Sequence, residues 1–482
     1  MSRAPSAALR NRNTSGRRLS PCIGVALLAL ALGAPPVLAQ QPPEPANAAS
    51  EAPPSTTASA NATPSEADSG PVEAPESTEQ GHTQLPESFE RRPLEELLHE
   101  SRLVGVRDTT FNVQLRSFYL HHDNFNNTEQ LASTAGGSAG FKTGYFYEHF
   151  AFGATGYTSQ KLHGPLDKDG TDLLEPGQRS YSVIGEAYGE ALLTEGVKAT
   201  AGRRSYDTPY LNGNDSRMTP ATFQGYTILG SLGGGDGPAL RFGAGSFDKE
   251  KQRNSEDFVS MATIAGAPAG VERGVQAAGA NFSVGKFSIG AMDYFCRDII
   301  NIAYAESKYA VALADRIGLR FGAQYASQRS NGEDLLTGHS FSTDQFGLKG
   351  EVVLGSALLT AAYTGTGGGA DMQSPWGAYP GYTSVQIENF YRAGEKAEML
   401  RAAYNFPQVR GLSAYGLYVH GSQPESPKQY PQDEYDLNVQ WDAGPGKLKG
   451  LTLRARYGHV AQDSSGNPHQ DDFRLMLFYQ LR

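Results

Sequence analysis

The chain of 482 residues has little cysteine and no long apolar run in its body. It has two cysteines, Cys22 and Cys296, which excludes a disulfide framework or a cysteine-ligated metal cluster. After residue 39, no stretch reaches the roughly 18 consecutive apolar residues that a membrane-spanning helix requires. Lysine and arginine number 41 against 51 acidic residues, giving a formal net charge of −10. This balance argues against a general nucleic-acid-binding protein.

The N-terminal region has the features of an exported protein. An arginine-rich start precedes the apolar run CIGVALLALALGAPPVLAQ, which ends in the small-residue pattern Val37-Leu38-Ala39. Residues 1–39 are therefore expected to be a cleaved secretory signal peptide. Residues 40–92 are rich in proline, alanine, serine and glutamate and predict a disordered periplasmic segment, which could reach the cell wall. Residues 93–107 are expected to form a short connector, and 108–482 a single β-rich domain.

From about residue 109 onward, apolar and polar residues alternate with a period of two. In LTLRARYGHV (451–460), leucine, alanine and tyrosine fall on one parity, and Arg454 and Arg456 on the other. Such alternation predicts strands with one apolar and one polar face. The predicted strands are 109–120, 139–148, 150–162, 179–191, 197–204, 222–232, 238–249, 273–284, 286–295, 299–311, 317–329, 342–354, 356–366, 395–405, 411–421, 433–442, 447–460 and 471–482.

Short turns and long loops alternate between these strands along the chain. The longest polar loops are 205–221, 250–272 and 367–394. An even number of strands, short turns at one end and long loops at the other indicate an all-β, transmembrane antiparallel barrel of about 18 strands in the bacterial outer membrane. A soluble β-sandwich also alternates. It would bury its apolar parity in a core, whereas here that parity is often only alanine, glycine or tyrosine. A barrel of this size is wide enough for an aqueous channel, so the arginines are expected to face the lumen.

Several segments resemble the OprD family of outer-membrane porins, also called outer-membrane carboxylate channels. They are DTPYLNGNDSRMTPATFQG (207–225), SPWGAYPGYTS (374–384), RAGEKAEMLRAAYNF (392–406), LRSFYLHHD (115–123), GFKTGYF (140–146), FAFGATGYTSQKL (150–162) and DYFCRDIINIAYAE (293–306). The resemblance covers essentially 105–482. It implies a monomeric 18-stranded channel whose third and seventh loops fold inward, with a ladder of basic side chains along the lumen. It further implies passive uptake of small carboxylate-bearing solutes such as amino acids, short peptides or aromatic acids.

The polar parity supplies candidates for this ladder, because a guanidinium matches the geometry of a carboxylate. They are Arg116, Lys198, Arg204, Arg320, Lys349, Arg401, Arg454, Arg456 and Arg474. Each could instead pair with a lumenal acid, and the acidic candidates are Glu186, Glu351, Glu434 and Asp436. Leu417 stands where a basic residue is expected, which casts doubt on one position of the ladder.

Six loop residues are candidates for the constriction. They are Asp207, Tyr210, Asp215, Arg217, Tyr379 and Tyr382. Asp215 and Arg217 are expected to brace the loop, and Tyr210 to line the channel. Tyr379 and Tyr382 could either meet the pore or pack between the loops.

The sequence gives less support to other functions. A porin for neutral oligosaccharides such as chito-oligosaccharides is the main alternative. A barrel enzyme that modifies lipid, or an anchor acting through its acidic tail, is less favoured, because no nucleophile elbow, phosphate loop or zinc motif is present. His121-His122-Asp123 is expected to lie in an external loop. No cofactor or metal is expected. The expected partners are small solutes, membrane lipid and lipopolysaccharide, and the barrel-assembly machinery.

Overall fold

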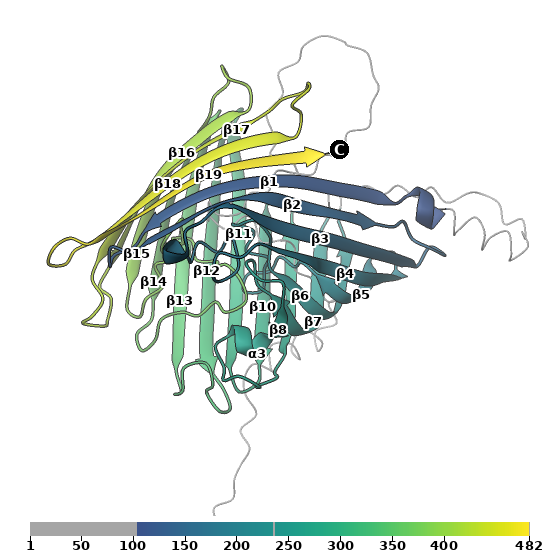
Figure 1. The fold of residues 1–482 in the computed structure, drawn as a ribbon, viewed down its shortest axis with the longest axis horizontal. Coiled ribbons are helices and arrows are strands. Elements are labelled where there is room, and N and C mark those ends of the chain that lie inside the picture. The colour runs from purple at the N-terminus through teal and green to yellow at the C-terminus, as the bar shows by residue number, and fades with distance from the viewer. Residues whose placement is uncertain (1–103, 235–236, 482) are drawn as a thin grey trace, which may run out of the picture. The chain divides into compact units, whose positions relative to one another are not determined.

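The computed structural model describes residues 104–234 and 237–481, and these form an antiparallel β-barrel (Figure 1). The predicted signal peptide, the segment 40–92 and most of the connector lie outside the described residues. The strands are β1 (Thr110–Asp123), β2 (Glu129–Lys142), β3 (Phe150–His163), β4 (Tyr181–Thr194), β5 (Val197–Arg204), β6 (Thr222–Gly233), β7 (Ala239–Lys251), β8 (Phe258–Ser260), β9 (Val275–Val284), β10 (Phe287–Cys296), β11 (Ile300–Ala314), β12 (Ile317–Ser330), β13 (Ser342–Leu354), β14 (Ala357–Thr366), β15 (Lys396–Asn405), β16 (Leu412–Ser422), β17 (Gln432–Asp442), β18 (Leu451–Gln462) and β19 (His469–Leu481). Two short helices, η1 (Leu166–Lys168) and α3 (Met261–Ile264), lie in loops.

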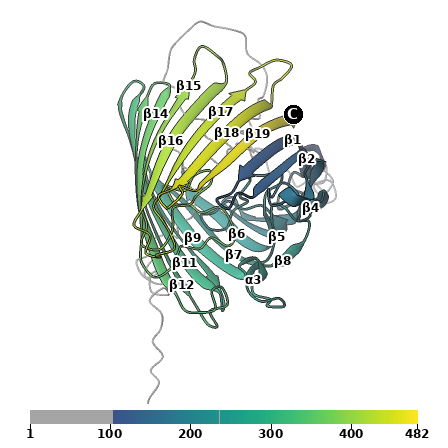
Figure 2. The same ribbon diagram turned by 60° about the vertical axis from the view of Figure 1, so that its left-hand side comes forward.

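The sheet closes on itself through its first and last strands. β1 pairs with β19 from Val113↔Leu481 to Asp123↔Asp471, and these strands lie side by side in Figure 2. β8 pairs only with β7, and β7 also pairs with β9, so 18 strands make the ring and β8 is a short addition to it. Closure matters because a sheet edge in lipid would leave backbone groups without hydrogen-bond partners. Among the described residues, no helix is both long and apolar enough to cross a bilayer.

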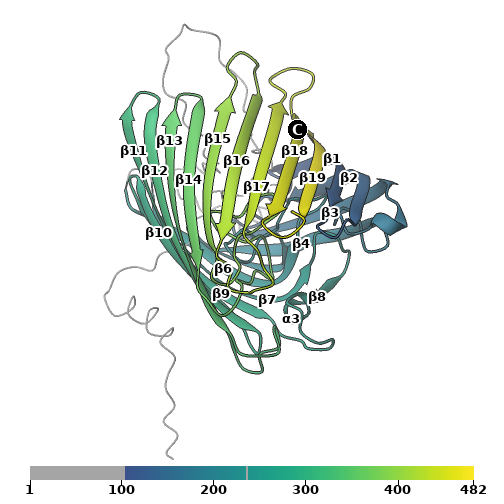
Figure 3. The same cartoon turned by 90° about the vertical axis from the view of Figure 1, so that its left-hand side faces the viewer.

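Residues alternate between the outer and the inner face along each strand. In β18, Leu453 and Tyr457 are exposed, whereas Arg454 and Arg456 are 6% and 2% exposed. The apolar parity is thus on the outside, where lipid covers it, and the polar parity faces the lumen. Figure 3 shows neighbouring strands running side by side along the wall from β11 to β19.

The predicted strands agree with the structure except at the second one. That strand was expected at 139–148, but β2 spans Glu129–Lys142. The prediction was wrong because the outward positions of β2 are mostly small residues, which give no apolar alternation. Gly137 has a φ of 140° and a Cβ there would lie 1.9 Å from the carbonyl oxygen of Gln114, so the close approach of β1 requires glycine. His121-His122-Asp123 also differs from expectation, since these residues end β1 rather than lying in a loop.

Two long loops contact each other and the inner face of the strands. Loop 3 (205–221) connects β5 to β6, and loop 7 (367–395) connects β14 to β15. Leu211 and Trp376 form a parallel bridge between them. The side chain of Asn212 donates to the carbonyl oxygen of Ala378 at 3.1 Å and accepts from the Ala378 amide at 2.8 Å. The two loops therefore form one hydrogen-bonded unit.

Candidate functional site

The centre of the loop unit is an aromatic cluster. Tyr210 of loop 3 is fully buried, and its ring contacts those of Tyr294, Tyr304 and Tyr379 at centroid distances of 6.0, 6.0 and 5.9 Å. The hydroxyl of Tyr379 donates to Gln345 on β13 at 2.7 Å. Burial raises the pKa of Tyr210 above its usual range. Tyr210, which was expected to line the channel, therefore packs between loop and wall.

Loop 3 is tied to β1 by a buried ion pair. Arg116 donates through both terminal nitrogens to Asp215, at 2.5 and 2.6 Å, and through Nε to Gln114 at 2.6 Å. Asp215, which was expected to brace loop 3 together with Arg217, holds the loop through Arg116 instead. Arg217 instead donates to the carbonyl oxygens of Thr171 and Ser216. Burial, together with nearby Arg474 and Arg253, lowers the pKa of Arg217 well below its ordinary value.

Loop 7 is held by two acidic side chains of β17. Glu434 accepts hydrogen bonds from the amides of Ile387 and Glu388, both at 2.8 Å. Asp436 accepts from the amide of Gln386 at 3.1 Å. Three successive backbone N–H groups of the loop thus meet two inward-facing carboxyl groups, which fix the position of this part of loop 7.

Arg474 of β19 extends this contact on the neighbouring wall. It donates to Asp472 at 2.6 Å through Nε and to the carbonyl oxygen of Gln386 at 3.2 Å. Asp472 also accepts from the side chain of Gln386 at 2.8 Å and lies 3.2 Å from His122. Arg474 is therefore engaged with a carboxylate and a loop.

The two arginines of β18 differ in their hydrogen bonds. Arg454 donates through Nε to Asn438 at 2.6 Å. Arg456 is 2% exposed, yet its Nε and Nη2 have no hydrogen-bond partner among the described residues. No described carboxylate lies within the 4.0 Å of an ion pair with Arg456. A buried guanidinium with two unused donors is costly.

Arg401 of β15 lies beside an aromatic ring. Its guanidinium carbon is 4.1 Å from the ring centroid of Tyr415, a cation–π contact. Its Nε has no hydrogen-bond partner in the described part of the chain. Its cross-strand neighbour is Leu417, which is buried in an apolar cluster with Tyr382 and Met399. The leucine noted in the sequence therefore packs under loop 7.

A second basic group lies near the turn end of the barrel. Lys142, Lys198 and Arg204 surround the buried carboxylate of Glu190, at 3.2, 3.6 and 2.9 Å. Three cations around one carboxylate leave an excess of positive charge on this wall. Lys142 and Glu190 were missed in the sequence, although the inward parity of their strands would have identified both.

The opposite wall carries paired charges. Lys349 lies 3.7 Å from Glu351 and 4.9 Å above the ring of Tyr382, whose hydroxyl donates to Glu306 at 2.7 Å. Arg320 is 4.0 Å from Glu351 and half exposed. These groups form a neutralised network rather than an unpaired basic row.

Two further candidates lie at the start of loop 3. Glu186 accepts from the Ser205 amide at 2.8 Å and from Thr155 at 2.7 Å. Asp207 lines a cavity of about 240 Å³ between loop 3 and the inner faces of β6, β7 and β9–β11. Glu186 thus bonds to the backbone of loop 3, whereas Asp207 lies beside this cavity.

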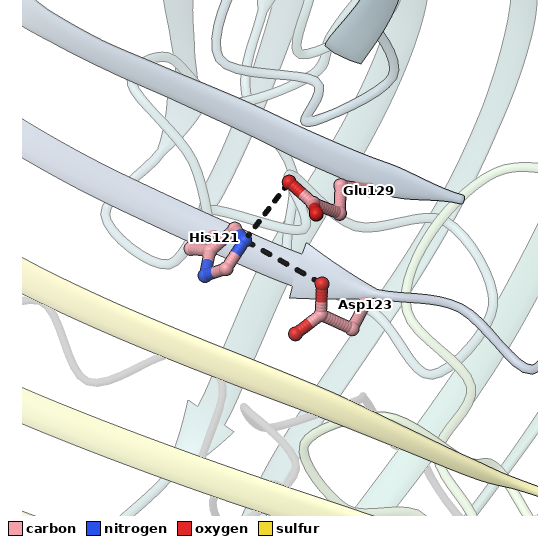
Figure 4. Close-up of side chains that lie close together, drawn as sticks. All are labelled: His121, Asp123 and Glu129. Atoms are coloured by element: carbon pink, nitrogen blue, oxygen red, sulfur yellow. Dashed lines mark ion pairs between the residues drawn. The ribbon is translucent and has the colours of Figure 1, made fainter. Parts of the chain in front are cut away.

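One group of possible metal ligands lies outside the lumen. His121 Nε2 is 3.5 Å from Asp123 and 3.7 Å from Glu129, at the extracellular ends of β1 and β2 (Figure 4). Glu129 is also ion-paired with Lys168. That ammonium competes with any cation for the carboxylate, so the arrangement does not favour a metal.

Comparison with known proteins gives a consistent picture. The model of the family described as "outer membrane porin, OprD family" matches residues 106–482. No curated protein matches.

Among solved structures, Pseudomonas aeruginosa OccK9 (OpdG) is similar with a TM-score of 0.70 and 22% identity, covering 78% of this chain and 99% of that one. Pseudomonas aeruginosa OpdK with vanillate has a TM-score of 0.67 and 21% identity, with the same coverage. A BenF-like porin from Pseudomonas fluorescens Pf-5 has a TM-score of 0.69 and 19% identity, again covering 78% and 99%. Because these sequence identities are low, the comparisons with solved structures show a similar fold and nothing more.

The family model covers most of the chain, and the fold agrees with it. This chain belongs to the OprD family of outer-membrane porins, a family of substrate-specific, non-enzymatic channels.

Proposed function

We propose that this porin carries small carboxylate-bearing solutes by passive diffusion, and that Arg456 is their principal binding point. The observation that supports this is the pair of unused donors on a buried guanidinium. A carboxylate of the solute can accept both N–H groups, which the wall leaves unpaired. Arg454, two residues along the same face, and Arg401 with its own unused Nε extend the path.

The other basic residues have different roles in this proposal. Arg116 and Arg474 hold loops 3 and 7 through Asp215 and Asp472, so they shape the constriction and do not exchange a solute. Lys142, Lys198 and Arg204 form an exit with excess positive charge around Glu190. A solute can move between staggered cations only where each site binds weakly enough to release it.

The substrate class is proposed to include aromatic acids. The structural relative OpdK is described with vanillate, an aromatic carboxylate. Here the ring of Tyr415 lies against Arg401, which offers an aromatic face next to a cation. This combination suits a solute with both a ring and a carboxylate.

Single-channel recording with a matched substitution tests the role of Arg456. Wild type, Arg456→Gln and Arg203→Gln are placed in planar bilayers and titrated with vanillate and with uncharged vanillyl alcohol. Arg203 is a matched control because it lies on the outer face, against Phe258. We expect vanillate to block wild type and the control, and Arg456→Gln to need about tenfold more vanillate. Equal block of all three proteins by vanillate would overturn the assignment of Arg456.

A further inference from the structure

On the outer face of the barrel, successive cross-strand partners form a continuous row from β10 to β2. We call it the climbing row, because it runs from one side of the membrane to the other. It starts at Phe287, the first residue of β10, next to a short turn, and passes through Gly350 and Tyr418. The row ends at Asp123 and Glu129, at the long-loop ends of β1 and β2. Because strands in such barrels are tilted, a row perpendicular to them rises from the periplasmic to the extracellular side.

A groove crosses the lower part of this row. A hollow of about 720 Å³ lies over β10–β16. Its floor is made of Ser307, Ala323, Gly350 and Ala361, which are small residues at outward positions. A Cβ added at Gly350 would meet nothing within 4 Å, so the space above it is open. Bulky neighbours such as Tyr309, Phe321, Leu348 and Leu400 form the rims.

The upper end of the groove meets a repeated polar pattern. β16 carries Tyr418-x-His420 facing Asp433 on β17, and Asp433 Oδ1 lies 2.7 Å from the tyrosine hydroxyl and 2.8 Å from His420 Nδ1. β18 carries Tyr457-x-His459 facing Asp471 on β19, where His459 Nδ1 is 2.9 Å from Asp471.

A third copy of the sequence, Tyr119-x-His121, stands on β1. There His121 lies 3.7 Å from Glu129 of β2, although the cross-strand partner of Glu129 is Asp123. All three copies face outward at the extracellular ends of upward-running strands. The repetition places a band of phenol, imidazole and carboxylate groups at the height of the lipid headgroups.

The groups of this band are better suited to bind the hydroxyl groups of a sugar than the phosphate group of a lipid headgroup. It carries carboxylates, and the climbing row contains no lysine or arginine among its described residues. The ammonium of Lys168, at the upper end of the row, is already paired with Glu129. The tyrosine and the histidine both use Oδ1 of Asp433, so lone pairs of Oδ2 can accept from a ligand. The imidazole uses Nδ1, so Nε2 is its second hydrogen-bonding position. Sugar hydroxyls can both donate and accept here, whereas an uncompensated phosphate would be repelled.

We propose that this face binds one glycolipid of the outer leaflet. An acyl chain lies in the groove over β11–β15, and the sugar headgroup is hydrogen-bonded by the Tyr-x-His/Asp groups of β16–β19. An acyl chain is narrow enough to reach the floor of the groove. A second copy of the porin is a less suitable occupant, because its convex wall would contact only the rims. This site is independent of the lumenal path.

Native mass spectrometry of the purified full-length porin tests the proposal. The probes are a glucosyl diacylglycerol and a phosphatidylglycerol with the same acyl chains. Gly350→Leu places an apolar side chain in the groove, where an added Cβ meets nothing within 4 Å. Gly416→Leu is the matched control, because Gly416 also faces outward, lies outside the groove, and has its nearest neighbour 3.8 Å from an added Cβ. The double variant His420→Ala/His459→Ala removes the imidazoles, and circular dichroism confirms that each variant is folded.

We expect wild type and Gly416→Leu to retain the glucosyl lipid about tenfold better than phosphatidylglycerol. Gly350→Leu should lose about tenfold in retention of both lipids. The double histidine variant should lose the preference for the sugar while still binding acyl chains. Equal retention by wild type and Gly350→Leu, or a wild-type dimer that Gly350→Leu dissociates, overturns the proposal; the second result would make the groove an interface between copies.

Discussion

At the residue scale, the lumenal charges divide into those that hold the loops and those that remain available. Inward parity alone does not separate them. Arg116 and Arg456 occupy equivalent alternating positions in the sequence, but only Arg116 has a bidentate carboxylate partner. That partner, Asp215, is 99 residues away and belongs to a loop whose path the sequence pattern does not describe. The sequence could therefore predict which residues face the lumen, but not which of them are already paired.

The ion pair of Arg116 gives a prediction at this scale. Asp215→Asn leaves a buried guanidinium without its counter-charge, which typically costs about 3–5 kcal/mol. We expect a lower unfolding midpoint in denaturant and a noisier, larger single-channel conductance, since loop 3 loses its tether. Asp108→Asn, which breaks an exposed pair with Arg107, is the control and should change neither quantity. An unfolding midpoint equal to that of wild type would contradict the structural role of Asp215.

At the element scale, the strands were predictable and the loops were not. Alternation located the strands because lipid outside and water inside impose a period of two on each of them. The predicted position of β2 was displaced because small residues such as Ala135 and Gly136 occupy both its faces. The loops follow no period, so the burial of Tyr210 and the bridge from Leu211 to Trp376 depend on tertiary contacts between segments far apart in the chain.

The anchoring of loop 7 gives a prediction at the element scale. Glu434→Ala removes the acceptor of two loop amides, those of Ile387 and Glu388. Hydrogen exchange at these amides should then become faster, by about tenfold or more, because their closed state loses a hydrogen bond. Glu398→Ala, on the outer face of β15, is the matched control and should leave exchange in loop 7 unchanged. Slow exchange in Glu434→Ala would show that other contacts hold the loop.

At the scale of the whole molecule, the closed barrel separates two chemistries. The outside offers an apolar belt with a groove and a band of histidine and tyrosine, while the inside offers fixed charges and two bonded loops. Only a closed sheet can keep these faces apart in a bilayer without leaving backbone groups unpaired. The function of the porin then depends on how strongly its lumen distinguishes a carboxylate from a neutral group of the same shape.

The flux of such a matched pair of solutes through proteoliposomes tests this central claim most directly. Vanillate and vanillyl alcohol share a ring and differ in the carboxylate, so a difference in their rates reports the recognition of charge. Protein-free liposomes give the background for each solute. After that subtraction, we predict that vanillate enters at least about tenfold faster, as expected for one strong charge-assisted contact. Equal entry of the two solutes, or faster entry of the alcohol, would contradict carboxylate selectivity and favour a porin for neutral solutes.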